Sequence, residues 1–217
     1  MTQQTLYTVT VYSENQVGLL NQISIIFTRR QLNIESLSVS GSAIEGVHKF
    51  TITTYSDRET MEKLVKQIEK RIDVLRAFFY TDDEIIFQEV ALYKVPTDKL
   101  LDDRSIEDLI RKHNARILEV NRTYTVIEKS GHPDETQSLF EELSRYDVMQ
   151  FVRSGRVAIT KSTVEHVSIF LQEQQYRQNL FQLFLIRNGN RHWQQSSTGF
   201  CIIKILLYNI RDVRINN

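Results

Sequence analysis

The sequence is poor in residues that mark several classes of protein. Of its 217 residues one is cysteine, Cys201, which excludes an internal disulfide and a cysteine-based zinc cluster. Lysine plus arginine and aspartate plus glutamate balance at 27 each, so no global charge attracts nucleic acid or an anionic membrane. With seven glycines, a glycine-rich phosphate-binding loop is hard to build, and no such motif occurs.

Targeting and membrane-spanning segments are missing as well. Residues 1–5 lack the basic and apolar stretches of a signal peptide. No apolar run approaches the roughly 20 residues that cross a bilayer. We therefore expect a cytoplasmic protein whose length allows one large domain or two small ones.

The sequence also contains no recognisable set of catalytic residues. The five histidines do not share a metal-ligand spacing, and the acidic runs 82–84 and 102–103 are typical of solvated turns. No nucleophile, base and oxyanion donors assemble into a recognisable set. We expect a non-catalytic binding or regulatory chain with no metal and no cofactor of its own.

Apolar periodicity predicts one complete unit over residues 6–80. Strands are expected at 6–13, 33–40, 47–55 and 74–80, and helices at 17–30 and from an N-cap at 56–57. Met61, Leu64, Val65 and Ile68 form the stripe of the second helix. The order βαββαβ predicts a ferredoxin-like α+β module, a four-stranded antiparallel sheet with both helices on one face. The other face is expected to be open and partly apolar, which favours pairing with another copy.

The same order returns more weakly over residues 86–160. Strands are expected at 86–95, 116–120 and 123–128, and a last one at 148–159 that is interrupted at Ser154-Gly155. Residues 96–103 are expected to form a polar loop. The predicted organisation is two tandem modules, at 5–82 and 86–165, followed by an atypical tail at 168–217.

The tail differs in composition from the rest. From Glu173 to Asn217 it carries six Lys/Arg against two Asp/Glu, and its apolar residues come in blocks without clean periodicity. A strand-and-helix appendage, a mobile tail and a locally altered reading frame all fit this pattern. We assign the tail no function.

One group of residues, the segment 14–19 together with Asn33, has the chemistry of a ligand-binding site. The segment 14–19 joins a strand to a helix, whose N-terminal N–H groups can hold a carboxylate. Gly18 permits close approach of a ligand, and Asn15 adds an amide. Asn33 falls at the opposite end of the same helix, so a two-fold pairing of modules could join it to the Asn15 turn of another copy. An ordinary turn and helix end would explain the same residues.

At these residues the sequence resembles a known family. Glu14-Asn15-Gln16-Val17-Gly18-Leu19-Leu20, then Phe27, Arg30 and Asn33-Ile34-Glu35-Ser36-Leu37, closely resemble the N-terminal ACT domain of acetolactate synthase small subunits. Asp73-Val74-Leu75-Arg76 and Arg153-Ser154-Gly155 also resemble landmarks of that family. The resemblance covers about residues 5–165.

The resemblance implies a regulatory function in branched-chain amino-acid biosynthesis. Such a subunit dimerises through its ACT domains, activates the catalytic large subunit and confers feedback inhibition by valine or a related branched-chain amino acid. The effector-binding residues would be Asn15, Gly18, Leu19, Asn33 and Ile34. The second module would serve assembly and partner contact. Thiamine diphosphate, magnesium and FAD would belong to the catalytic partner.

Two other functions stay open at this stage. A free-standing ACT-type amino-acid sensor could regulate another enzyme or a transcription factor. RNA-binding domains share the βαββαβ order, but the third strand, residues 47–53, lacks their glycine-aromatic signature.

Two residues depart from the family pattern. Gln31 stands where glycine is common at the end of the first helix, so it must adopt the left-handed region or the helix must end differently. Val17 replaces the usual small residue or proline before Gly18.

Overall fold

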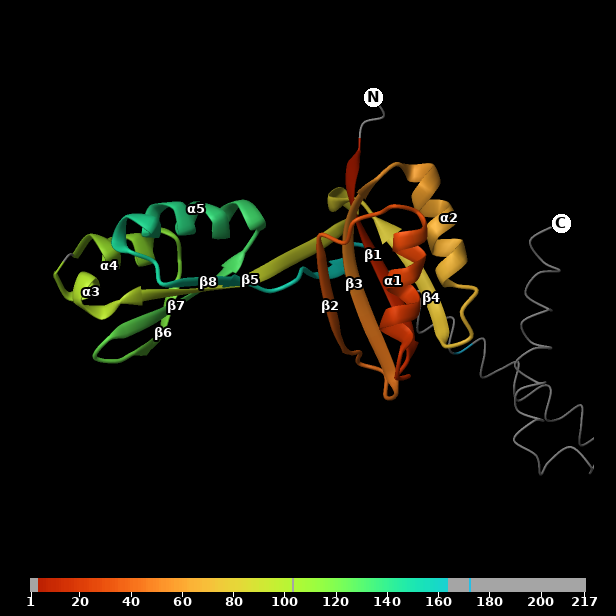
Figure 1. Ribbon diagram of the computed structural model, residues 1–217, viewed down its shortest axis with the longest axis horizontal. Coiled ribbons are helices and arrows are strands. Elements are labelled where there is room, and N and C mark those ends of the chain that lie inside the picture. Colours follow the sequence, from red (N-terminus) through yellow and green to blue (C-terminus); the bar gives the residue numbers. More distant parts are fainter. Residues whose placement is uncertain (1–3, 103, 164–171, 173–217) are drawn as a thin grey trace, which may run out of the picture. The chain divides into compact units, whose positions relative to one another are not determined.

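The computed structural model describes residues 4–102, 104–163 and 172, and these form two antiparallel sheets with helices against them (Figure 1). The first sheet has the strand order β2-β3-β1-β4; the second has β6-β7-β5-β8, with β9 also paired to β5. The predicted α+β fold with two ferredoxin-like modules is therefore confirmed. The predicted tail, 168–217, lies outside the described residues apart from residue 172.

The first module follows the predicted order. Its elements are β1 (Thr5–Glu14), α1 (Leu19–Arg29), β2 (Ser36–Gly41), β3 (Val47–Ser56), α2 (Arg58–Ile68) and β4 (Val74–Tyr80). Strand β1 alternates, so that Tyr7, Val9 and Val11 point into the core while Thr8 and Thr10 face the other way.

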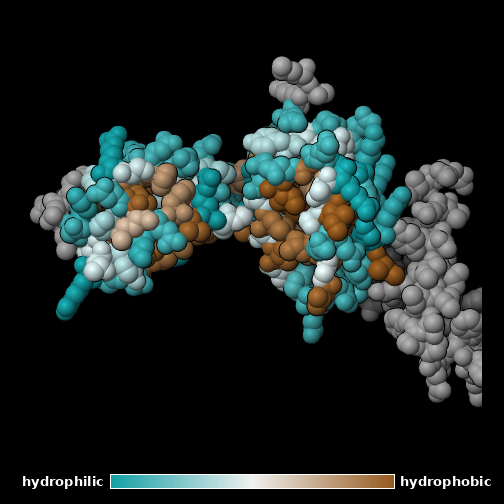
Figure 2. All heavy atoms as spheres, in the orientation of Figure 1, coloured by the Kyte–Doolittle hydropathy of each residue, from teal (hydrophilic) through white to brown (hydrophobic). Residues whose placement is uncertain are grey.

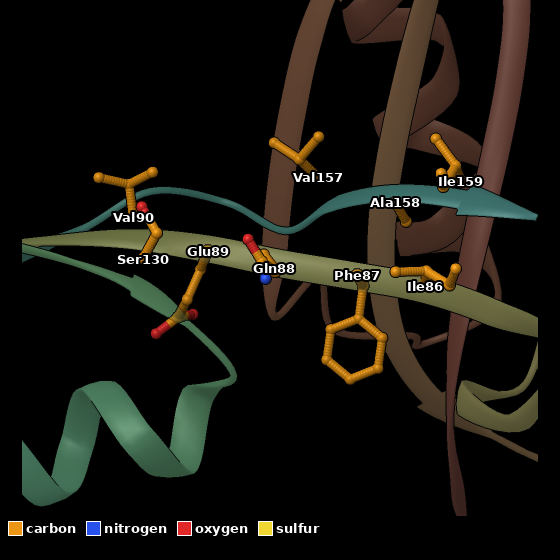
Figure 3. A pocket seen from close by; sticks show the side chains of 9 residues that line it. All are labelled: Ile86, Phe87, Gln88, Glu89, Val90, Ser130, Val157, Ala158 and Ile159. Carbon is orange, nitrogen blue, oxygen red and sulfur yellow. The ribbon is translucent and has the colours of Figure 1, made fainter. Parts of the chain in front are cut away.

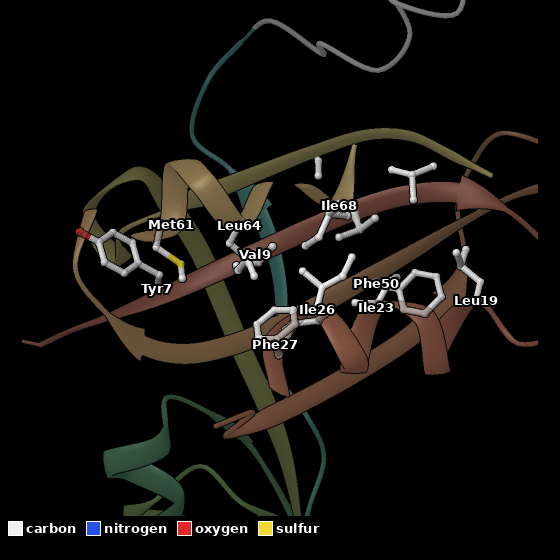
Figure 4. Packing of buried hydrophobic residues seen from close by; sticks show 14 residues of the cluster. Tyr7, Val9, Leu19, Ile23, Ile26, Phe27, Phe50, Met61, Leu64 and Ile68 are labelled. Carbon is white, nitrogen blue, oxygen red and sulfur yellow. The ribbon is translucent and has the colours of Figure 1, made fainter. Parts of the chain in front are cut away.

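The core of this module lies between the sheet and its two helices (Figure 4). Helix α1 contributes Leu19, Ile23, Ile26 and Phe27, and α2 contributes Met61, Leu64 and Ile68, with Val65 partly buried beside them. These are the spacings of one helical face, which explains why both helices pack on the same side of the sheet.

The second module repeats the arrangement. Its elements are β5 (Ile85–Pro96), α3 (Thr97–Asp102), α4 (Arg104–Lys112), β6 (Arg116–Val120), β7 (Tyr124–Gly131), α5 (Pro133–Leu143), β8 (Gln150–Arg153) and β9 (Val157–Thr160), with single-turn 3-10 helices at Asp82–Glu84 and Ser144–Tyr146. The polar loop predicted over residues 96–103 is wrong, because Thr97–Asp102 is helical. Good helix formers, with Asp98 in the first turn, favour this short helix.

The predicted interruption at Ser154-Gly155 divides the last strand into β8 and β9. Strand β8 pairs with residues 91–94 of β5, whereas β9 pairs with residues 85–88 of the same strand. The twelve-residue strand β5 therefore carries both pieces. We call the two-stranded part made by β9 and the first half of β5 the ribbon.

The helix-free face of the first sheet differs from the prediction of an open, partly apolar surface. Thr8, Thr10, Thr51 and Thr53 are buried there. Contacts with the ribbon account for part of this burial: the Lys49 Nζ donates to the carbonyl of Ala158 at 2.5 Å, and Arg156 contacts Thr8. Because residues on a strand alternate between faces, the threonines of β1 follow from its apolar residues pointing to the core.

Candidate functional site

The turn before α1 has the geometry of an open anion site. Gly18 is the N-cap residue with φ 85°, a left-handed conformation that glycine adopts without strain. No side chain caps this helix, and no acidic residue lies in its first turn. Space for a ligand exists beside Gly18, because a Cβ atom there would meet nothing within 4 Å. The positive end of α1 is therefore available to a carboxylate.

The predicted residues around this turn have different exposures. The side chain of Leu19 is buried in the core, so only its backbone could contact a ligand. Val17 is fully exposed, at 104%, and Leu20 is 43% exposed. These two apolar side chains border the turn and add an apolar rim to it.

At the other end of α1 the chain turns sharply into β2. Gln31 has φ 56°, so of the two possibilities for this non-glycine residue the left-handed one is realised. The Asn33 carbonyl accepts a hydrogen bond of 2.6 Å from the Thr54 hydroxyl, and its amide Nδ2 donates to Glu35 Oε1 at 2.9 Å. Ile34 packs half-buried against the core.

Within one chain the structure does not bring the Asn15–Gly18 turn and Asn33 together. Helix α1 has 11 residues, which at ~1.5 Å per residue is roughly 16 Å. The sheet register agrees: Glu14 pairs with Val47, while the Glu35 N–H bonds the carbonyl of Thr53, six residues along β3. A pocket containing both Asn15 and Asn33 therefore requires a second copy of the chain.

Apolar side chains are exposed on the surface of the same module. Ile25 on α1 and Val39 on β2 are exposed, in addition to Val17 and Leu20. Figure 2 shows apolar side chains gathered on the visible side of this module, between β2 and α1. Exposed apolar groups of this kind are common where proteins associate.

A second surface feature was not predicted. A hollow of about 360 Å³ lies along the ribbon, lined chiefly by apolar side chains from β5 and β9, including Ile86, Val90, Val157 and Ile159 (Figure 3). Phe87 points to the opposite side of β5. The sequence indicated that both faces of β5 are apolar. Apolar residues occur at its even and at its odd positions, which is typical of a strand covered on both faces.

Two ionisable groups on the helix-free face of the first sheet are perturbed by burial. Burial lowers the pKa of Lys49, whose Nζ lies 5.9 Å from the centroid of the Tyr12 ring. The pKa of Tyr80 rises to about 12, mainly because of burial, with smaller contributions from Tyr12 and Glu84. Neither residue lies in the predicted effector set.

Over the described ranges, no three His, Cys, Asp or Glu side chains gather as metal ligands would. Among the helices described, none is both long and apolar enough to span a bilayer.

Comparison with known proteins gives a consistent result. Residues 9–76 match the sequence model of the "AHAS small subunit-like ACT domain", and residues 88–162 match the "Small subunit of acetolactate synthase". The acetolactate synthase small subunit of Bacillus subtilis (strain 168) is 31% identical over 164 residues, covering 74% of this chain and 93% of that protein. That of Mycolicibacterium smegmatis is 28% identical over 155 residues, covering 71% and 91%.

A solved structure shows the same arrangement. The crystal structure of the acetolactate synthase small subunit from Thermotoga maritima superposes with a TM-score of 0.67 at 26% identity. The match covers 73% of this chain and 99% of that one.

Proposed function

Because the chain belongs to the acetolactate synthase small-subunit family, we propose that it is a non-catalytic regulatory subunit of that enzyme. It binds and activates the catalytic large subunit and confers feedback inhibition by valine or a related branched-chain amino acid. It acts in the cytoplasm as a dimer formed through its first modules. Thiamine diphosphate, magnesium and FAD belong to the catalytic partner.

The uncapped start of α1 is the observation that supports an effector site. An amino acid would place its carboxylate on the first-turn N–H groups beside Gly18. The Asn15 amide would add a donor to the same carboxylate, and Asn33 of a second copy would offer its side-chain oxygen to the ammonium group. Val17 and Leu20 of one copy and Ile34 of the other would surround the apolar side chain, which favours valine or a similar residue over polar amino acids.

Valine can regulate the catalytic subunit in this way only if its affinity differs between the free chain and the complex. If valine changes the affinity of this chain for the catalytic subunit, the catalytic subunit must change the affinity of this chain for valine by the same factor. Valine binding should therefore be measured by calorimetry with and without the catalytic subunit.

Reconstitution tests the proposed function directly. Adding the purified chain to the catalytic large subunit should raise the rate of acetolactate formation, and millimolar valine should reduce the stimulated rate. No change in rate would contradict the regulatory role. Valine binding without any effect on the rate would instead favour a free-standing sensor of another target.

Mixed dimers test the location of the effector site. Asn15→Ala and Asn33→Ala should each abolish valine binding at the inter-copy pocket of a homodimer, whereas Gln137→Ala on α5 should not. In a heterodimer of the two variants one inter-copy pocket has lost both amides and the other has lost neither. The intact pocket should bind valine with wild-type affinity, which a site formed by Asn15 and Asn33 of a single chain could not restore.

A further inference from the structure

The segment Arg153–Arg156, which runs from the last residue of β8 to the residue before β9, lies beside a hollow of about 460 Å³. Residues of the first module, including Leu6, Glu35 and Tyr55, line one part of it. Pro133 and the 153–156 segment line the part that belongs to the second module. The volume is within the usual range for a small-molecule site.

Ser154 and Gly155 make contacts that fix the walls of the hollow. The Ser154 hydroxyl accepts from the Val90 N–H at 2.9 Å, and the Ser154 N–H donates to the Val90 carbonyl at 2.8 Å. Gly155 packs so closely on β2 that a Cβ atom there would lie 2.8 Å from the Leu37 carbonyl oxygen. This closeness explains why a glycine stands at this position.

Arg156 joins the two modules from the same segment. Its guanidinium donates to the Thr8 hydroxyl at 2.9 Å and to the Asp82 carboxylate at 2.5 Å, and it lies 3.7 Å from the centroid of the Phe87 ring. The residue is only 6% exposed. Because its charge is paired and its position is fixed by both modules, the hollow is preformed.

Arg153 differs from its neighbours because its charge is accessible. Its side chain is 39% exposed, and its Nη1 lies 3.6 Å from Glu89 Oε1, beyond hydrogen-bond distance. Glu89 is itself held by the Thr136 hydroxyl, so it orients Arg153 from a fixed position. A guanidinium has five N–H donors in a planar fork, which suits a carboxylate.

Glu35 supplies the opposite charge from the first module. The Asn33 amide donates to its Oε1 at 2.9 Å and orients the carboxylate, which retains a second oxygen for another donor. An ammonium group is such a donor. Leu6, Tyr55 and Pro133 add apolar surface to the same hollow.

We propose that this hollow is a second small-molecule site, which takes an α-amino acid with an apolar side chain: Arg153 binds its carboxylate and Glu35 its ammonium group. The site lies within one chain. It is therefore distinct from the pocket proposed between two copies and does not depend on it.

Binding measurements on the full chain test this site. The probes are L-valine, L-leucine, L-isoleucine and L-methionine, titrated by calorimetry into the Asn15→Ala variant, which lacks the inter-copy pocket but keeps the Asn33 amide that orients Glu35. At least one of them should bind with one site per chain. Leucinamide and 4-methyl-2-oxopentanoate, which lack the carboxylate and the ammonium group respectively, should bind at least tenfold more weakly than leucine.

Further substitutions in the Asn15→Ala variant assign the contacts. Arg153→Gln and Glu35→Gln should each weaken binding about tenfold or more, whereas Arg145→Gln, on an exposed turn, should not. Glu35→Gln leaves the Arg153–Glu89 pair intact, so its effect cannot be attributed to an unpaired Glu89, and circular dichroism checks the fold of each variant.

Absence of binding to the Asn15→Ala variant would overturn the second site and leave the regulatory role untouched. Binding that is insensitive to both glutamine substitutions would overturn it as well.

Discussion

Helices α2 and α5 each have a side-chain carboxylate that accepts a backbone N–H at their N-terminal end, and α1 has none. At the start of α2, the Asp57 carboxylate accepts the Thr60 N–H at 2.8 Å. At the start of α5, Pro133 occupies the first turn and the Glu135 carboxylate accepts the His132 N–H at 3.3 Å. Helix α1 has no such side chain. A capping side chain satisfies a free helix N–H group and typically contributes about 1 kcal/mol. Because α1 has no such side chain, its first N–H groups are free for an external anion.

The two cores differ in polarity as well. Beside its apolar cluster, the first module buries hydroxyl side chains, including those of Thr8, Thr10, Thr51 and Thr53. The second module buries the charged Glu89, Glu128 and Lys129 in addition to its apolar cluster, and the Tyr93 hydroxyl donates to the Thr136 carbonyl at 2.6 Å. Burying a charge costs more than burying a hydroxyl unless the charge is paired, so the second module depends more on ion pairs.

Truncating core side chains should show whether the two modules, which differ in their buried polar groups, still unfold together. Leu64→Ala in the first module and Leu139→Ala in the second each remove a fully buried side chain and should lower the free energy of unfolding by about 3 kcal/mol. Because Arg156 and Lys49 join the modules, we expect urea to unfold them in one transition. Leu118→Ala, on an exposed strand, is the control. Two separate transitions, each moved by one variant, would show that the modules unfold independently.

A smaller effect should come from the left-handed residue at the end of α1. Gln31→Gly removes the strain of a non-glycine residue at φ 56° and should raise the free energy of unfolding by about 1 kcal/mol. Gln31→Ala keeps a Cβ atom and should give no comparable gain. Thermal or urea unfolding measures both. A loss of stability in Gln31→Gly would show that the Gln31 side chain contributes more than its backbone strain costs.

The smallest effect is expected in acid. A hydrogen bond from Ser130, followed by the contact with Arg116, lowers the pKa of Glu128. The ionised form therefore stabilises the second module above the unfolded-state pKa of about 4.3, and this stabilisation is lost as the pH falls through the lower folded-state pKa. Glu128→Gln should flatten the decline of stability below about pH 4.3, whereas Glu141→Gln, on α5, should not. An unchanged decline in Glu128→Gln would assign the acid sensitivity to other carboxylates.

Local sequence determined most of the fold. Alternation along β1 and the stripes of α1 and α2 suffice to predict the first module, because one buried face requires that periodicity. The break at Ser154-Gly155 was also visible in the sequence. The segment 97–102 was missed because a six-residue helix is too short to show a clear period.

For the candidate sites, the sequence by itself determined the turn at Asn15–Gly18 and the segment that begins at Asn33, since both follow from local turn and helix-end chemistry. Only the tertiary structure decided that these residues lie at opposite ends of α1 in one chain, that Leu19 is turned into the core, and that Glu35 and Arg153 line one hollow. Arg156 and Thr8 are 148 residues apart in the chain. Contacts over such separations depend on how whole elements pack, and no local pattern in a single sequence records them.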